Sequence, residues 1–398
     1  MKSQRKSSFF FIDSLSGGGA ERVVSVLGQE FINRGIGVTI VMMRRRPIAY
    51  SLPSQIKLIY ADELTVTSLY GKLTQRVYSL YNKLRQRGYK PLMVHLGRYN
   101  DKPRSNETTF YFYANYALAY RELLKNNPGC TAFGFLIRSN ICLLQAARGV
   151  REIKTVFCER NNPVRPDMPP HIMKLRDRYY SRADVGVFQT NDEMAYYTRL
   201  KGPKLVIPNP IKDDLPNIFQ GKRRKEIVNF CRLTEQKRLS LLVDAFHMLL
   251  KDYPSFTLRI YGKGDYEDSL RSYIDNQGLS DRVFIESFAL NIHERIHDAT
   301  MFVSTSDFEG LSNSMLEAMA IGLPCVCTDC DGGGARMMIR DHENGLLVPK
   351  GDVNAVYRAM KEIIENPGLA QKLSNEAYKI RKELSVDKIV EKWMEVIR

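Results

Sequence analysis

Short apolar segments alternate with amphipathic helical segments along most of this chain. Apolar and β-branched runs predict buried strands at 9–13, 38–43, 132–136, 155–158, 185–189, 204–207, 226–230, 257–261, 283–286 and 302–305. Helical spacing of apolar residues predicts helices at 20–34, 239–250, 265–277 and 293–299, and a last one at about 386–398. Alternation of this kind is typical of parallel sheets with helices on both faces. The pattern therefore predicts an α/β protein with two doubly wound, Rossmann-like parallel sheets that face each other.

The break between the two sheets is expected at Pro208-Asn209-Pro210, which interrupts the strand and helix pattern. A chain of 398 residues is long enough to bury two cores. We therefore predict one domain over residues 1–207 and a second over residues 211–385.

Charge divides the chain in the same way. Residues 1–200 hold 31 basic and 15 acidic side chains, a balance of +16, whereas residues 201–398 have a balance of −1. A basic half indicates an anionic partner, either nucleic acid or an anionic membrane surface. Residues 69–90 favour the membrane, because leucines and a valine recur at helical spacing among basic residues and tyrosines. The alternative is a solvated helix that packs on its own domain. Nucleic acid is disfavoured, since no RNA- or DNA-binding motif is present.

The early apolar run Phe9-Phe10-Phe11-Ile12 is cut off by Asp13, so it is too short for a secretory leader and fits a buried strand. Seven cysteines fall at irregular spacings, which indicates reduced thiols in a cytoplasmic protein. We expect no structural metal, because no second cysteine pair accompanies Cys325, Cys327 and Cys330. None of the six histidines is an evident catalytic base, and His95 is interpreted as structural.

The segment from Asp307 to Ala320 has the composition of a ligand-binding helix start. Ser312 or Asn313 can cap a helix there, and a helix start presents unpaired amides and partial positive charge, which suit a phosphate. Glu309 precedes this helix and Glu317 lies in its first turns, so both carboxylates can accept hydrogen bonds from sugar hydroxyls. The pattern indicates a nucleotide-sugar site. An ordinary capped helix with surface glutamates is the alternative.

Several further motifs occur in a fixed order around this segment. They are Gly17-Gly18-Gly19, Arg232 with Lys237, Gly332-Gly333-Gly334 and Asn344-Gly345. With the glutamate pair Glu309 and Glu317, they make the chain resemble the retaining GT-B glycosyltransferases of family 4, of the bacterial polysaccharide and lipid-linked glycan type. The likeness runs from about Phe9 to about Trp393. It implies the GT-B fold, a nucleotide-sugar-binding domain at 211–385, an acceptor-side domain at 1–207, and packing of the helix at 386–398 back on the first domain.

The resemblance also implies roles for individual residues. Arg232 and Lys237 would stabilise the leaving diphosphate, although Cys231 replaces the glycine that usually precedes the arginine. Glu309 would bind the donor sugar and Glu317 the ribose. The remaining donor contacts would come from Gly18, Gly19, Gly262, Phe288, Gly310, Asn313, Ser314 and Leu316. Acceptor-side contacts are expected from Arg138, Arg160 and Asn161.

These expectations define one function. The protein would be a metal-independent, retaining hexosyltransferase without a cofactor, peripheral on the inner face of the cytoplasmic membrane. It would transfer a hexose or N-acetylhexosamine from a UDP-sugar to a lipid-linked oligosaccharide in the synthesis of capsule, O-antigen or exopolysaccharide. The alternative is a partner subunit that keeps the fold but has weak catalytic activity.

Overall fold

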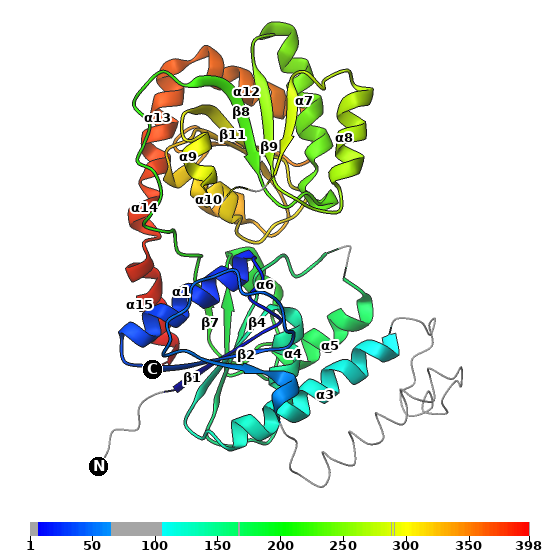
Figure 1. Cartoon of the computed structure of the whole chain (residues 1–398), viewed down its shortest axis with the longest axis vertical. Coiled ribbons are helices and arrows are strands. Elements are labelled where there is room, and N and C mark those ends of the chain that lie inside the picture. Colours follow the sequence, from blue (N-terminus) through cyan, green and yellow to red (C-terminus); the bar gives the residue numbers. More distant parts are fainter. Residues whose placement is uncertain (1–6, 65–105, 166–167, 288, 290, 398) are drawn as a thin grey trace. The chain divides into compact units, whose positions relative to one another are not determined.

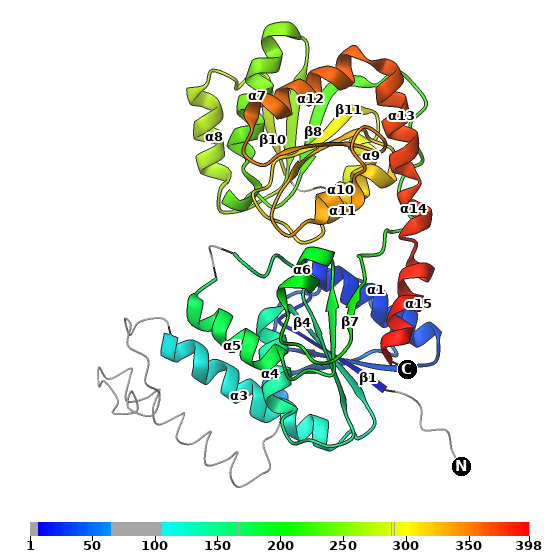
Figure 2. The same ribbon diagram turned by 180° about the vertical axis from the view of Figure 1, so that it is seen from behind.

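The computed structural model describes residues 7–64, 106–165, 168–287, 289 and 291–397, which form two compact units (Figures 1 and 2). Unit 1 comprises Met1–Glu159, Pro166–Val187 and Tyr197–Leu205, and unit 2 comprises Arg160–Arg165, Phe188–Tyr196 and Val206–Arg398. The basic segment 69–90, His95 and Phe288 lie outside the described residues. Within the described ranges, no helix is both long enough and apolar enough to cross a membrane.

The first sheet has the strand order β3-β2-β1-β4-β5-β6-β7, and its neighbours from β3 to β6 are parallel. Its strands are β1 (Ser7–Ile12), β2 (Gly37–Met42), β3 (Lys57–Tyr60), β4 (Thr131–Phe135), β5 (Lys154–Cys158), β6 (Val185–Phe188) and β7 (Lys204–Val206). The helices between them are α1 (Gly19–Asn33), η1 (Ala61–Glu63), α3 (Asn106–Lys125), α4 (Leu136–Ala146), α5 (Pro170–Tyr180) and α6 (Asn191–Tyr196). This order is that of a Rossmann-like sheet.

Strand β1 is apolar because it lies between β2 and β4 with both faces covered. Phe10 is fully buried and meets Phe31 of α1 and Phe133 of β4 edge to face, with ring centroids 5.5 and 5.3 Å apart. Burial of each such ring contributes about 1.5–3 kcal/mol. This cluster fixes the end of β1, where the glycine loop begins.

The second sheet is parallel throughout, in the order β10-β9-β8-β11-β12-β13. Its strands are β8 (Arg224–Phe230), β9 (Thr257–Tyr261), β10 (Val283–Glu286), β11 (Ala299–Ser304), β12 (Cys325–Asp329) and β13 (Leu346–Pro349). The helices are η3 (Glu235–Lys237), α7 (Leu239–Asp252), α8 (Glu267–Asn276), α9 (Ile292–Ile296), α10 (Asn313–Ala320), α11 (Gly334–Met338), α12 (Val353–Glu365), α13 (Pro367–Tyr378), α14 (Ile380–Glu383) and α15 (Val386–Ile397).

Alternate residues of the second sheet point to opposite faces. On one face, Ile227 of β8 and Val303 of β11 join residues of α7, α8 and α12 in a single apolar cluster. On the other face, Phe230 packs against Phe302 at 5.3 Å and against His293 of α9 at 5.9 Å. The sheet is therefore covered on both sides, which explains why its strands read as continuous apolar runs.

Each sheet reverses its direction of winding once. In the first sheet the reversal lies between β1 and β4, and in the second it lies between β8 and β11. Open parallel sheets bind their ligands at the carboxyl ends of the strands that flank this point. Residues that follow β1, β4, β8 and β11 are therefore the candidates for ligand binding.

The structure confirms the predicted α/β class and most of the predicted elements, and β9 and β10 have the predicted bounds. One prediction is wrong: the helix expected at 293–299 ends at Ile296, and Ala299 already belongs to β11. The reason is pairing with β8, because Arg224 N donates to Asp298 O at 2.8 Å and Ala299 lies opposite Arg224. The C-terminal helix is present, and its packing on the first domain stays a prediction.

Candidate functional site

The loop after β8 positions Lys237. Arg232 follows the strand by two residues and is exposed, and η3 then returns the chain to the start of α7. Arg238 takes the left-handed conformation, with φ 47°, at the junction of η3 and α7. Thr305, which directly follows β11, is hydrogen-bonded to this loop. Its Oγ1 donates to Lys237 O and Arg238 O, both at 3.1 Å. The backbone of Lys237 is therefore fixed to the neighbouring strand.

The loop after β11 is joined to the same structure. Asp307 N donates to Gln236 O at 2.9 Å, and Gln236 Nε2 donates to Phe308 O at 2.6 Å. Glu309 N donates to Asp331 O at 2.8 Å, in the loop that follows β12. Three strand ends thus hold the backbone of Glu309 at the switch point of the second sheet.

Lys237 and Glu309 form an ion pair, in which Lys237 Nζ donates to Glu309 Oε1. The two side chains are 11% and 17% exposed, so water screens the pair only in part. Burial lowers the pKa of Lys237, but the neighbouring Glu309 carboxylate outweighs it, and the net shift of this pKa is upward. Lys237 therefore stays protonated at neutral pH beside an acceptor carboxylate.

Helix α10 begins beside this pair, and the predicted cap is confirmed. Ser312 is its N-cap and accepts from Met315 N at 3.4 Å, while Leu316 N donates to Ser312 O at 3.1 Å. The amides of Asn313 and Ser314 belong to the first turn, where helix geometry offers no partner. The Asn313 side chain accepts from Asn209 Nδ2 at 2.7 Å. The start of α10 is thus capped and still presents two amides that can bind an anion.

Glu317 lies one turn further along α10 and is 7% exposed. Its Oε2 is 2.9 Å from His293 Nε2 on α9. The His293 ring stands edge-on to Phe230, with an interplanar angle of 88°. Since Phe230 is the last residue of β8, Glu317 belongs to the same edge of the sheet as Arg232 and Lys237.

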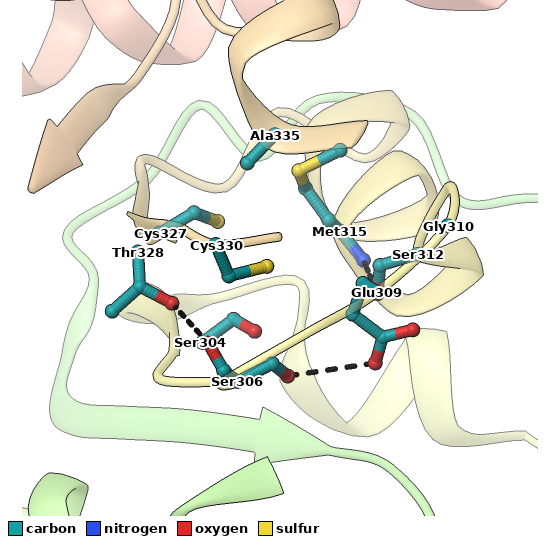
Figure 3. A pocket seen from close by; sticks show the side chains of 10 residues that line it. All are labelled: Ser304, Ser306, Glu309, Gly310, Ser312, Met315, Cys327, Thr328, Cys330 and Ala335. Atoms are coloured by element: carbon teal, nitrogen blue, oxygen red, sulfur yellow. Dashed lines mark hydrogen bonds between the residues drawn. The ribbon is translucent and has the colours of Figure 1, made fainter. Parts of the chain in front are cut away.

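A small hollow lies between the ends of β11 and β12 and helices α10 and α11 (Figure 3). Glu309 lines it, and Ser306 Oγ donates to Glu309 Oε1 at 3.4 Å. Its other lining residues are Ser304, Gly310, Ser312, Met315, Cys327, Thr328, Cys330 and Ala335. Small polar and sulfur-containing side chains therefore line the hollow beside Glu309.

The glycines after β12 are explained by close backbone packing against the Glu309 loop. Gly332 has φ +99°, and a Cβ there would lie 1.7 Å from Glu309 O. A Cβ on Gly334 would lie 2.0 Å from Gly310 O. Glycine is required where two backbones approach this closely.

Gly332→Ala is expected to lower the free energy of unfolding by about 2 kcal/mol or more, because backbone strain adds to the clash with Glu309 O. Gly351→Ala is the matched control, since Gly351 has φ +78° but nothing within 4 Å of its Cβ position. Urea denaturation of both variants tests this prediction. Equal losses of stability would show that the clash has no effect.

The chain is similar to known proteins in sequence and in fold. The family model for glycosyl transferases group 1 matches residues 212–380. The Anabaena protein HepE in complex with UDP-glucose superimposes with a TM-score of 0.72 over 98% of this chain and 99% of that chain, at 15% identity. The chain has the GT-B fold. The family-model match also supports a place among the glycosyltransferases.

Two curated relatives illustrate the sequence similarity. Poly(glycerol-phosphate) alpha-glucosyltransferase of Bacillus subtilis is 28% identical over 187 residues, which are 47% of this chain and 27% of that protein. N-acetylgalactosamine-N,N'-diacetylbacillosaminyl-diphospho-undecaprenol 4-alpha-N-acetylgalactosaminyltransferase of Campylobacter jejuni is 28% identical over 276 residues, which are 66% of this chain and 74% of that protein. Three curated relatives, including the B. subtilis protein, are matched over 27%, 36% and 49% of their own lengths, so this chain spans less than half of each.

In the first GT-B sheet, the predicted glycine loop follows β1 at the switch point. Gly18 is the N-cap of α1, and its amide donates to the Tyr50 hydroxyl at 2.9 Å. Gly17 has φ +116°, and its amide donates to Glu21 Oε2 at 2.5 Å. Gly19 is the exposed first residue of α1. Arg138 is exposed in the first turn of α4, which directly follows β4.

Arg160 and Asn161 belong to unit 2 rather than to the first unit. The Arg160 side chain is 8% exposed and donates through Nη2 to Asn209 Oδ1. Asn209 in turn donates to Asn313, so Arg160 is linked to the start of α10. Asn161 lies against Gly310, where an added Cβ would be 3.2 Å from Asn161 Cα. An acceptor-side role for both residues stays a prediction.

Gly262 has a structural explanation beside its predicted donor role. A Cβ there would lie 1.9 Å from Cys231 O, so the residue lets the β9 end pack against the Arg232 loop. Burial raises the pKa of the Cys231 thiol to about 11. All seven cysteines are free thiols, as predicted. Among the described residues, no group of histidine, cysteine or acidic side chains is arranged to hold a metal ion.

The sequence pattern marks neither His293 nor Asn209 as part of the site. It places His293 in a helix and Asn209 in a linker. The only local signal for Asn209 is its place between two prolines, and its burial at 2% exposure, which requires side-chain partners, is known from the structure alone. No local pattern marked His293, since its partner lies 24 residues away on another helix.

Proposed function

We propose that this GT-B protein is a retaining glycosyltransferase of family 4. It transfers a hexose or N-acetylhexosamine from a UDP-sugar to a lipid-linked oligosaccharide in the synthesis of a surface polysaccharide. The observation that carries the proposal is the Lys237–Glu309 ion pair at the switch point of the second sheet, beside the capped start of α10. A cation, a carboxylate and free helix amides together suit a sugar diphosphate.

The diphosphate is assigned to the positive side of this site. Arg232 and Lys237 follow the same strand, and the amides of Asn313 and Ser314 open α10. Negative charge grows on the diphosphate as the bond to the sugar breaks. Fixed cations and helix amides stabilise that charge without reorganising, which lowers the barrier. Because these groups balance the charge, the proposed reaction needs no metal ion.

The sugar and the ribose are assigned to the two glutamates. Glu309 accepts hydrogen bonds from hydroxyls of the transferred sugar, and Glu317 accepts them from the ribose. The bond from the anomeric carbon to the diphosphate breaks, and the bond to the acceptor oxygen forms on the same face. The acceptor proton passes to the leaving phosphate. Retention is supported by the alpha linkages named for the B. subtilis and C. jejuni relatives, since UDP-glucose is itself α-linked.

The proposed acceptor is a lipid-linked glycan at the membrane surface. The C. jejuni relative is named for a diphospho-undecaprenol glycan, which supports a lipid-linked acceptor here. The balance of +16 over residues 1–200 supports binding of this half to the anionic inner face of the cytoplasmic membrane. Nucleotide sugar, lipid-linked glycan and membrane surface are therefore the proposed partners.

Donor binding gives the first test. In a thermal unfolding screen of UDP-, GDP- and ADP-sugars, a UDP-sugar is expected to stabilise the protein most. Saturation at a hundred times the Kd adds about 2.7 kcal/mol to the free energy of unfolding. The Glu317→Ala variant should lose most of this shift. Stabilisation by GDP- or ADP-sugars alone would refute the UDP assignment.

A partner subunit with weak activity would also bind the donor, so a second measurement is needed. We expect the purified protein to release UDP from the stabilising sugar nucleotide, either by transfer or by slow hydrolysis. Donor binding without any release of UDP, even with lipid-linked acceptors and vesicles present, would favour the partner subunit.

A further inference from the structure

We propose that His293 is a positioning residue that aims the Glu317 carboxylate at the ribose hydroxyls of the nucleotide. This inference rests on the proposed function, because it takes Glu317 as the ribose ligand. His293 belongs to α9, a five-residue helix that begins six residues after β10 ends. Nothing in its sequence neighbourhood marks it as part of the site. The structure brings it to Glu317.

The hydrogen bond defines what His293 can do. His293 Nε2 is 2.9 Å from Glu317 Oε2, and an ionised carboxylate only accepts hydrogen bonds. Nε2 therefore carries the proton and donates it to the carboxylate. A hydrogen bond to one carboxylate oxygen restricts rotation of the group and sets the direction of the other oxygen. The carboxylate oriented in this way is the group that the proposed function assigns to the ribose.

Packing holds the imidazole in place for this task. The His293 side chain is 14% exposed, and its ring meets Phe230 edge to face at 5.9 Å. Phe230 is 8% exposed at the end of β8 and packs in turn on Phe302 of β11. The ring is thus supported by the two strands that flank the switch point. Support of this kind is what a group needs in order to orient a ligand-binding carboxylate.

The burial of Glu317 makes such a partner necessary. Its side chain is 9% exposed, and a carboxylate at this depth needs hydrogen bonds to stay ionised. His293 supplies one such hydrogen bond. Loss of this bond loosens the carboxylate, so that ordering it against a ribose hydroxyl costs more conformational entropy. The expected loss therefore falls on the ribose contact and leaves the diphosphate contacts intact.

The test compares UDP with 2′,3′-dideoxy-UDP by isothermal titration calorimetry. Wild-type protein is expected to bind UDP about tenfold more tightly than the dideoxy nucleotide, the value of one hydrogen bond to a charged group. His293→Phe keeps a ring against Phe230 but has no donor, and should weaken UDP binding about five- to tenfold while dideoxy-UDP binding changes less than twofold. His293→Gln restores an N–H donor and should recover most of the preference for UDP.

His297→Phe is the matched control. His297 also meets a phenylalanine edge to face, Phe219 at 5.4 Å, but its Nδ1 lies 2.8 Å from the Glu294 carbonyl oxygen. This variant should keep the wild-type preference, and thermal unfolding should confirm that every variant is folded.

The outcomes separate this inference from the proposed function. A wild-type protein that does not distinguish the two nucleotides refutes the ribose role of Glu317 and the inference with it. A wild-type preference that survives in His293→Phe overturns the inference alone. Equal weakening of both nucleotides in His293→Phe also overturns it, because His293 would then be a structural residue.

Discussion

Replacement of Lys237 by alanine is expected to lower kcat for sugar transfer by about a hundred- to a thousandfold, the usual loss when one preorganised electrostatic group is removed. The cation acts on charge that appears as the diphosphate leaves, so kcat should fall more than the donor KM rises. Glu309→Ala should lower the rate of transfer to a similar degree, because the hydroxyls of the transferred sugar lose the carboxylate that accepts their hydrogen bonds. Both are measured as release of UDP in the presence of acceptor.

Lys251→Ala is the control for the loss of a lysine, since Lys251 is exposed in the last turn of α7. It should keep wild-type kcat. Circular dichroism should show that the Lys237 and Glu309 variants keep their secondary structure. Near-normal transfer by both folded variants would remove the observation on which the proposed function depends.

The double variant Lys237→Met/Glu309→Gln is expected to recover part of the stability that each single substitution loses, but to recover no activity. Each single substitution leaves a partly buried charge without its partner, which should cost about 1–3 kcal/mol in the free energy of unfolding. The double variant removes both charges. Its loss in the free energy of unfolding should be smaller than the sum of the two single losses, by a coupling energy of about 1–2 kcal/mol. It should nevertheless be inactive. Urea denaturation and UDP release test the two halves of this prediction.

The pH dependence of the same pair follows from the raised pKa of Lys237. A raised pKa contributes stability that is fully present below the ordinary value of 10.5 and is lost as the pH rises through the higher value in the folded protein. The coupling energy should therefore be the same from neutral pH up to about pH 10 and should disappear as the pH rises through the raised pKa of Lys237. Additive losses at pH 7 would show that the ion pair contributes nothing.

Much of the fold could be predicted because strands and helices leave local patterns. The strands Thr257–Tyr261 and Val283–Glu286 have their predicted bounds, and Ser312 caps α10 as predicted. The short helix α9 was predicted too long, because helical spacing continues past Ile296 while pairing with β8 begins the next strand. Local pattern cannot register that competition, which depends on a strand about 70 residues earlier in the chain.

In the candidate site too, the positions of residues along the chain follow local patterns, whereas their contacts depend on distant parts of the chain. Sequence pattern alone places Arg232, Lys237, Glu309 and the start of α10 after strands, since a residue's place after an apolar run is a local property. Their partners depend on the folded chain: Lys237 contacts Glu309 across 72 residues, and His293 contacts Glu317 across 24. These contacts exist because β8 lies next to β11 in the sheet and α9 lies on the same face as α10. Strand order is set by burial of the whole sheet, which no short segment encodes.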